Sequence, residues 1–209
     1  TCFCGKTKFM DKRVASESGV SVETLSVSYG ARTAVDAVSL AIPKGKITVL
    51  AGPNGCGKST LLRAIRRLHP AKSGRVLLDG LETGRLREKE IAREIGLLGQ
   101  SPSAPEDMRV EELVRLGRFP HQAMMQPWSA EDATAIEDAM FGTGIGHLRD
   151  RRLGSLSGGQ LQRVWIAMVL AQETDVICLD EPVNHLDMAH QIVCLDLVSR
   201  LNRERGRTV

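Results

Sequence analysis

Aromatic residues are scarce in this sequence, at 3% of its 209 residues. A surface that binds single-stranded nucleic acid needs aromatic rings on which bases stack. The sequence also lacks a large excess of charge of either sign. Its 28 Lys and Arg residues nearly balance its 25 Asp and Glu residues, which leaves a net charge of +3. Nucleic-acid-binding domains usually carry a strong basic excess. We therefore expect no nucleic-acid partner.

Long hydrophobic runs are also missing. The longest apolar run, residues 164–171, is much shorter than the ~20 residues that cross a bilayer. No apolar segment near the N-terminus indicates a signal peptide. The five cysteines lack paired spacing, which argues against a disulfide framework and is typical of a reducing compartment. We expect a cytosolic chain that is able to dock on a membrane protein.

Segments of strand length alternate with helical segments along much of the chain. We expect strands at residues 20–29, 35–42, 47–51, 76–78, 95–98 and 175–179. We expect helices at residues 58–68, 88–94, 110–116, 130–141, 160–171 and 188–205. This alternation predicts an α/β fold with a largely parallel core sheet, and the first strands form an antiparallel edge. The continuous apolar run 47–51 predicts a strand that is buried on both faces.

The pattern also predicts how the chain is divided. Residues 1–19 are polar without periodicity, so we expect a disordered leader there. Residues 103–153 show helical segments and no strand, which predicts a helical subdomain inserted in the core. The α/β core is then formed by residues 20–102 and 154–209. A chain of this length has room for one such domain.

A glycine-rich segment between the strand 47–51 and the following helix fits the pattern G-x-x-x-x-G-K-[ST]. Its backbone N–H groups and the helix N-terminus attract phosphate. Lys58 would neutralise β- and γ-phosphate oxygens, and the Ser59 hydroxyl would ligate Mg²⁺. The pattern alone leaves open which nucleotide is bound and whether it is hydrolysed. The expected binding residues are Gly52, Pro53, Asn54, Gly55, Cys56, Gly57, Lys58, Ser59 and Thr60.

Two acids follow the apolar strand near residue 179. Asp180 would hold Mg²⁺ through water, and Glu181 would act as general base on the attacking water. The alternative is an acidic helix cap, since Pro182 follows, but the phosphate loop favours the catalytic interpretation.

A second candidate anion site is Ser157-Gly158-Gly159-Gln160, at the start of a helix. Its alternative is a flexible turn with a serine cap. Two phosphate-binding loops in one chain indicate that each binds its own nucleotide or that two chains share one.

The order of these motifs resembles the ATP-binding subunits of ABC transporters. The resemblance rests on GPNGCGKST, a lone Gln100 after a strand, LSGGQ, VICLDEP and NHLD, and spans about residues 20–209. It implies a P-loop NTPase fold that binds ATP with Mg²⁺ and works as a head-to-tail homodimer. By matching position, Tyr29 would stack on adenine, and Gln100 would contact Mg²⁺ and the attacking water. Ser157, Gly158, Gly159 and Gln160 would meet the γ-phosphate held by the partner subunit, and Asp187 would communicate across the dimer.

Residues 110–121, 162–172 and 186–191 are similar to importer ATPases for iron–siderophore complexes, with haem and vitamin B12 importers nearby. This similarity implies permease subunits, an indirect partnership with a substrate-binding protein, and a place on the cytoplasmic face of the membrane. The stretch 117–121 would lie at the permease groove or form an ordinary surface loop. Alternatives are a soluble ABC ATPase of the iron–sulfur assembly type and a non-enzymatic regulatory module. The intact Lys58, Asp180 and Glu181 argue against the regulatory module.

One feature departs from the family pattern. The family carries a switch histidine one strand beyond the helix that follows Asp187. This sequence ends at Arg207-Thr208-Val209, where that strand is expected to begin. The resemblance therefore predicts that these 209 residues alone hydrolyse ATP weakly.

Overall fold

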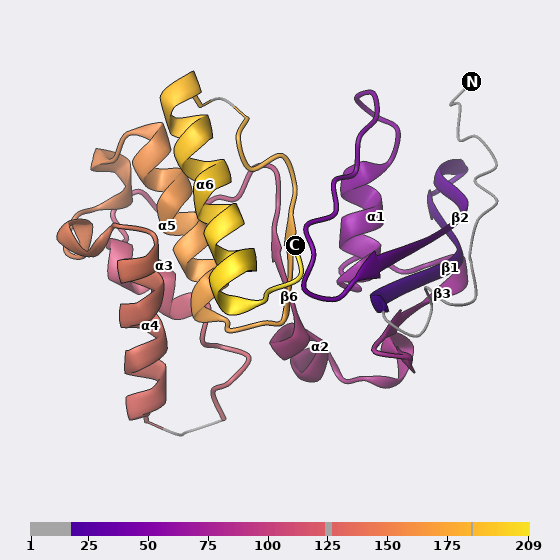
Figure 1. Cartoon of the computed structure of the whole chain (residues 1–209), viewed down its shortest axis with the longest axis horizontal. Helices are drawn as coiled ribbons and strands as arrows, with labels where there is room; N and C mark the ends of the chain where they lie inside the picture. Colours follow the sequence, from indigo (N-terminus) through magenta and orange to yellow (C-terminus); the bar gives the residue numbers. More distant parts are fainter. Residues whose placement is uncertain (1–17, 124–126, 185) are drawn as a thin grey trace.

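The computed structural model describes residues 18–123, 127–184 and 186–209. A β-sheet and helix α1 lie on one side of the molecule, helices α3 to α6 lie on the other, and β6 lies between them (Figure 1). The predicted leader 1–19 falls outside the described residues except for Ser18 and Gly19. These two residues begin strand β1, so the boundary of the leader was placed two residues too late.

The sheet beside α1 has the order β2-β1-β3-β4 and is antiparallel. Its strands are β1 (Ser18–Tyr29), β2 (Arg32–Pro43), β3 (Ser73–Leu78) and β4 (Leu81–Glu82). In β1, Val20, Val22, Leu25 and Val27 are buried. Buried residues alternate along β1 up to Val22, and the alternation resumes one position later, at Leu25. The pairing with β2 shifts register between these residues, at Thr24, whose φ is 44°. This bulge keeps both apolar pairs on the core side. The predicted antiparallel edge is confirmed.

The parallel part of the fold consists of β5 (Ile95–Leu98) and β6 (Val176–Leu179), paired from Ile95↔Val176 to Leu98↔Leu179. Both strands were predicted, and among the described residues they are the only parallel pair of strands. Side chains of β6 alternate between two hydrophobic clusters, because successive residues of a strand point to opposite faces. Val176 and Cys178 join the cluster of the antiparallel sheet and α1, the sheet cluster. Ile177 and Leu179 join the cluster of α3, α4, α5 and α6, the helical cluster.

The prediction of a doubly buried strand at 47–51 is wrong. The structure assigns no strand there, and the Val49 side chain is 81% exposed. Its backbone pairs with the end of the described chain, where Thr48 N–H donates to Val209 O at 2.7 Å and Val209 N–H donates to Lys46 O at 3.0 Å. A mostly apolar cavity of about 300 Å³ separates the segment from β6. An apolar run is buried as a strand only where neighbouring strands pair with it along its length.

Among the described residues, six α-helices follow the predicted pattern closely. They are α1 (Lys58–Ile65), α2 (Glu88–Glu94), α3 (Val110–Leu116), α4 (Ala130–Gly142), α5 (Gly158–Ala171) and α6 (Met188–Arg205). Short 3₁₀ turns lie at Thr83–Arg85 (η2), Gly146–Leu148 (η3) and Leu153–Ser155 (η4). Ser129 caps α4, since its Oγ accepts from Asp132 N–H at 3.1 Å. Within the described ranges, no helix is long and apolar enough to cross a membrane.

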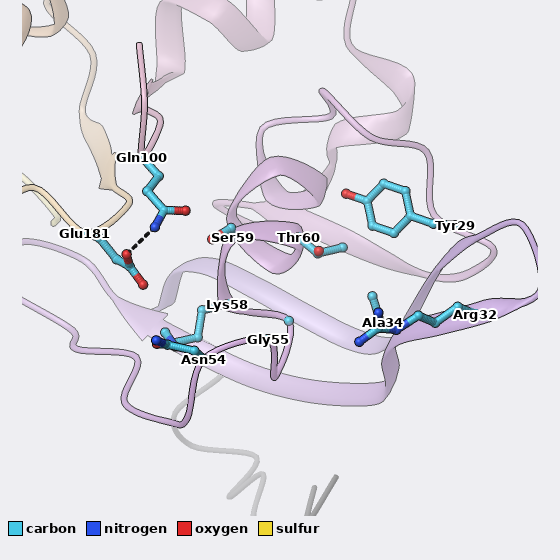
Figure 2. A pocket seen from close by; sticks show the side chains of 11 residues that line it. Tyr29, Arg32, Ala34, Asn54, Gly55, Lys58, Ser59, Thr60, Gln100 and Glu181 are labelled. Carbon is cyan, nitrogen blue, oxygen red and sulfur yellow. Dashed lines mark hydrogen bonds between the residues drawn. The ribbon is translucent and has the colours of Figure 1, made fainter. Parts of the chain in front are cut away.

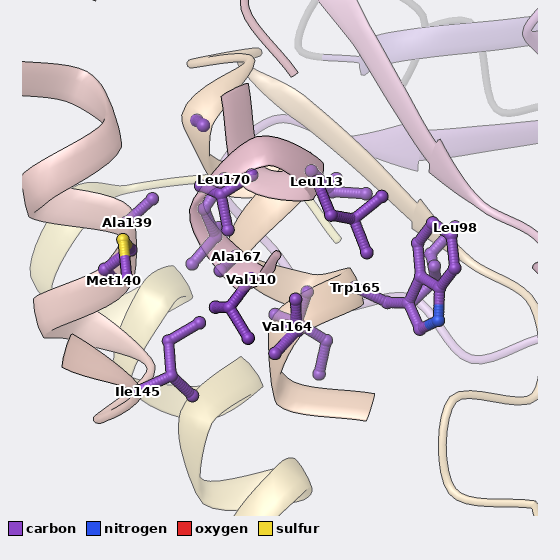
Figure 3. Packing of buried hydrophobic residues seen from close by; sticks show 14 of the residues in the cluster. Leu98, Val110, Leu113, Ala139, Met140, Ile145, Val164, Trp165, Ala167 and Leu170 are labelled. Carbon is purple, nitrogen blue, oxygen red and sulfur yellow. The ribbon is translucent and has the colours of Figure 1, made fainter. Parts of the chain in front are cut away.

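The regular secondary structure in the described part of 103–153 consists of helices joined by turns and loops, as predicted, apart from an isolated bridge between Arg109 and Arg152. Val110, Leu113 and Met140 of this segment pack against Val164 and Leu170 of α5 (Figure 3). The segment therefore shares the helical cluster with the rest of the chain. Its separation as a subdomain stays a prediction.

The stretch 117–121 is anchored in the fold rather than lying free on the surface. Arg118 is 4% exposed, and its guanidinium donates to Asp132 Oδ1 at 2.8 Å and to Ala171 O at 2.8 Å. His121 Nε2 lies 2.8 Å from Gln172 O. Phe119 alone presents a large apolar surface, at 59% exposed. Most of this stretch therefore joins α3 to the body of the helical side.

Candidate nucleotide-binding site

A cleft of about 510 Å³ opens between the antiparallel sheet, the loop before α1 and the ends of β5 and β6 (Figure 2). It brings together nine of the residues that the sequence predicted for ATP binding or catalysis. These are Tyr29, Asn54, Gly55, Gly57, Lys58, Ser59, Thr60, Gln100 and Glu181. Tyr29 lies at one end of the cleft, and Gln100 and Glu181 lie at the other (Figure 2). Segments distant in sequence thus converge on one concave surface.

The loop before α1 depends on glycine at its last position. Gly57 has φ 100°, in the left-handed region that L side chains disfavour. A Cβ there would lie 3.3 Å from Val35 Cγ2 and would collide with the carbonyl oxygen of Ala34 on β2. The loop can therefore lie this close to the sheet only without a side chain. The free N–H groups at the start of α1 then face the cleft region as a site for an anion.

Lys58 folds along this loop in the structure. Its Nζ donates to Gly52 O at 2.9 Å and to Pro53 O at 3.1 Å, and it lies 4.0 Å from Cys56 Sγ. Lys58 as a whole is half-buried and lines the cleft. Phosphate oxygens would replace the neutral carbonyls as acceptors, and an ionised acceptor makes the stronger hydrogen bond.

Ser59 and Asp180, the two predicted Mg²⁺ ligands next to the phosphates, meet directly. Ser59 Oγ donates to Asp180 Oδ1 at 2.9 Å. Asp180 is 3% exposed, and its Oδ2 atom is buried with no hydrogen-bond partner in the structure. A buried carboxylate oxygen without a partner is costly, and hard cations bind carboxylate and hydroxyl oxygens. These residues therefore fit Mg²⁺. Gln100, the third predicted ligand, contacts Glu181 instead.

Glu181 is held in a strained position by two amide side chains. Its φ is 53°, a conformation that costs a non-glycine residue on the order of 1–3 kcal/mol. Gln100 Nε2 donates to Glu181 Oε2 at 2.5 Å, and Asn184 Nδ2 donates to the same oxygen. Asn184 was not among the residues predicted for the site. Its position three residues after Glu181 is the signal that could have indicated this contact. A turn brings the two residues together there, because Asn184 N–H donates to Glu181 O at 3.1 Å.

At the other end of the cleft, Tyr29 presents an aromatic ring that is 45% exposed. The His69 ring packs against it, with centroids 4.2 Å apart and planes inclined by 33°. Arg32 and Ala34 of β2 also line the cleft and were not predicted. The short turn between β1 and β2 pairs Tyr29 with Arg32, but the strand predicted at 35–42 began after Arg32 and Ala34 and therefore gave no signal for them.

The second anion motif does not reach this cleft. Ser157 caps α5, because its Oγ accepts from Gln160 N–H at 3.3 Å while Gln160 Oε1 accepts from Ser157 N–H at 3.0 Å. Gly158 is exposed, and Gly159 is buried. Asp187 caps α6 in the same manner, accepting from His190 N–H at 2.9 Å. None of these residues lines the cleft of its own chain.

The family model described as ABC transporter matches residues 35–184, more than half of the chain. The chain belongs to the ABC transporter family. Members of this family bind ATP, generally with Mg²⁺, and hydrolyse it. The predicted P-loop NTPase fold is confirmed by the solved structures that this ABC protein resembles.

Two solved structures illustrate the similarity. A metal-chelate type ABC transporter in an inward-facing conformation superposes with a TM-score of 0.79 at 32% identity, over 92% of this chain and 71% of the other. A dimeric ATP-binding cassette in a post-hydrolysis state with ADP and Pi superposes with a TM-score of 0.77 at 28% identity, over 91% of this chain and 85% of the other.

Two relatives carry names that describe transport or import of an iron complex. The ferric enterobactin transport ATP-binding protein FepC of Escherichia coli (strain K12) is 51% identical over 90% of this chain and 69% of its own length. The iron(3+)-hydroxamate import ATP-binding protein FhuC of Bacillus subtilis (strain 168) is 46% identical over 92% of this chain and 71% of its own length.

Proposed function

We propose that this ABC protein is the ATP-binding and hydrolysing subunit of an importer that drives uptake of an iron–siderophore complex. The observation that carries the proposal is the cleft in which Lys58, Ser59 and Glu181 converge. The names of FepC and FhuC support the cargo class. The haem and vitamin B12 importers, and a soluble ATPase of the iron–sulfur assembly type, remain the alternatives.

In the proposed reaction, adenine stacks on Tyr29, and the phosphates lie over the loop 52–57 and the N-terminus of α1. Lys58 neutralises the β- and γ-phosphates. Mg²⁺, held by Ser59 and through water by Asp180, would withdraw charge from the phosphate oxygens. Glu181 accepts a proton from the water that attacks the γ-phosphorus, and the bond to the bridging oxygen breaks to release ADP and phosphate. Gln100, already bonded to Glu181, orients the carboxylate and the water.

The proposal includes a head-to-tail homodimer. Ser157, Gly158, Gly159 and Gln160 lie outside the cleft of their own chain, which supports a role toward the nucleotide of a second copy. Asp187 would communicate across the same interface. Permease subunits, served by a substrate-binding protein, would bind this ATPase at the cytoplasmic face of the membrane, and the dimer would close on ATP and reopen after hydrolysis.

ATP hydrolysis by the purified protein tests the chemistry. We expect Lys58→Ala to abolish ATP binding, and Glu181→Gln to retain binding while turnover falls at least ~100-fold, in the range of a lost general base. Normal turnover in Glu181→Gln would contradict the proposed mechanism. That these 209 residues alone hydrolyse ATP weakly stays a prediction, which the same assay measures.

Uptake of labelled cargo tests the biological role. In cells that lack the gene, we expect ferric-siderophore uptake to be lost, and restored by the unaltered gene but not by Lys58→Ala. Vitamin B12 is measured in parallel. Loss of vitamin B12 uptake alone would reassign the cargo, and normal uptake of both would favour the soluble alternative.

A further inference from the structure

The glycine at position 159 is buried against a histidine of another helix. A Cβ on Gly159 would lie 2.6 Å from both Cγ and Nε2 of His190, closer than real Cβ contacts allow. The neighbouring Gly158 differs, because a Cβ there would meet no atom within 4 Å. The two glycines of one motif are therefore needed for different reasons, and only Gly159 is constrained by packing within its own chain.

The opposite edge of the same imidazole is tied to Asp187. His190 Nδ1 lies 2.8 Å from both carboxylate oxygens of Asp187, so it donates to this cap of α6. The backbone N–H of His190 donates to Asp187 Oδ1 at 2.9 Å. These two hydrogen bonds, the backbone one first, hold the pKa of Asp187 below its usual value. The ring thus has a fixed orientation, with one edge on Asp187 and the other on the start of α5.

We propose that His190 is a positioning residue that sets where Ser157, Gly158 and Gly159 stand for the nucleotide of a second copy of this chain. The proposal rests on the proposed function, in which that motif and Asp187 act across a dimer. The imidazole is the direct bridge between them: Asp187 fixes the ring, and the ring supports Gly159. Close-packed contacts respond even to small changes in the volume of a side chain. Loss of the ring would therefore let the start of α5 shift.

The structure also explains why the role acts on dimer formation rather than on the chain's own cleft. Neither His190 nor Gly159 lines that cleft, and neither is hydrogen-bonded to Lys58, Ser59 or Glu181 among the described contacts. Binding of ATP to the loop 52–59 should therefore be independent of the imidazole. Closure of two copies around that ATP should depend on it.

The experiment uses the Glu181→Gln protein, in which slow hydrolysis preserves the ATP-bound state. Sedimentation velocity measures its ATP-dependent dimerisation, and a fluorescent ATP analogue measures binding to the monomer. We expect His190→Ala to weaken the dimer at least tenfold and to change monomer binding less than twofold. His147→Ala is the matched control, because His147 is an exposed histidine on η3, away from this contact.

A pair of double variants separates packing from a general effect. Gly159→Ala should weaken the dimer. Adding His190→Ala to this variant should make its dimer at least tenfold tighter than that of Gly159→Ala alone, because removal of the ring makes room for the methyl group. Gly158→Ala should not be rescued by His190→Ala, because its Cβ does not meet the ring. Absence of rescue at Gly159, or equal rescue at both glycines, would overturn the proposal.

The shared nucleotide site and the role of His190 are tested separately. If Glu181→Gln binds ATP but stays monomeric, the shared nucleotide site is wrong, and the role of His190 falls with it. If Glu181→Gln dimerises and His190→Ala dimerises equally well, the shared site stands and the role of His190 alone is refuted.

Discussion

Replacement of Arg118 by alanine should be among the most destabilising single changes on the helical side. The guanidinium is 4% exposed and bonds to Asp132, to Ala171 O and, at 2.7 Å, to Glu173. The Asp132 side chain is only 7% exposed, so the alanine variant would leave a buried carboxylate without its cation. This situation is more costly than the loss of a surface ion pair.

The magnitude follows from the burial of each partner. Breaking a buried pair by removing one side costs about 3–5 kcal/mol. Glu173 is 49% exposed, and such a pair contributes only ~0–1 kcal/mol. We therefore expect Arg118→Ala to lower the free energy of unfolding by about 3–4 kcal/mol, a large part of the 5–15 kcal/mol of a typical domain. Glu173→Gln is the matched control and should lower it by less than about 1 kcal/mol.

Urea unfolding followed by circular dichroism measures both variants. Asp132→Ala on the Arg118→Ala background should recover part of the loss, because no buried charge is then left unpaired. A loss below about 1 kcal/mol in Arg118→Ala would refute the argument that this buried pair stabilises the fold.

The pH dependence of the same pair has a definite sign. Burial alone would raise the pKa of Asp132, but hydrogen bonds from Arg118 and Ser129 hold it below its usual value. A depressed carboxyl pKa stabilises the fold above the unfolded value of ~3.9, and this contribution is lost as pH falls through the folded pKa. In Arg118→Ala the guanidinium no longer opposes burial, so the pKa of Asp132 should rise, and the difference in unfolding free energy between the parent and the variant should shrink as pH falls toward and below ~3.9.

Three further outcomes are expected. Tyr29→Ala should weaken ATP binding by about 1–3 kcal/mol, the value of one stacked base. His69→Ala should weaken it by less, because this change removes only the ring that packs against Tyr29. Equal effects of the two changes in a fluorescence titration would mean that His69 itself holds the nucleotide. Gly57→Ala should abolish ATP binding in the same titration, since its φ of 100° leaves no room for a methyl group beside β2; unchanged binding would contradict this. Burial raises the pKa of Cys178 to about 12, so iodoacetamide at neutral pH should label Cys56 and spare Cys178 in the folded protein. Detection of label on both cysteines by mass spectrometry would refute the burial argument.

Local signals predicted most elements well. The expected bounds of α2, β5, α3 and α6 coincide with those observed, because apolar periodicity and caps such as Asp187 are written in neighbouring residues. The site was predictable for a similar reason. The loop 52–59 is one contiguous motif, and the acids at 180 and 181 follow a buried strand, so each half of the cleft is encoded locally.

The misses concern contacts between distant segments. Residues 47–51 have the composition of a buried strand, but pairing partners decide whether such a strand forms, and composition does not name them. Arg118 stands in a stretch that resembles a surface loop, and its burial depends on Asp132 and on the end of α5. The contact of Gly159 with His190 joins residues 31 positions apart in the sequence and has no local signature.

The alternation of β6 between the two hydrophobic clusters has a consequence for how the molecule unfolds. Val176 and Cys178 face the sheet cluster, whereas Ile177 and Leu179 face the helical cluster. Neither cluster is therefore able to open without exposing one face of this strand, which ties two separate cores into one cooperative unit. The amide protons of β6 should exchange with solvent only through global unfolding, while those of the exposed ends of α6 exchange through local fraying. The strand that directly precedes Asp180 and Glu181 would then be the last part of the protein to open.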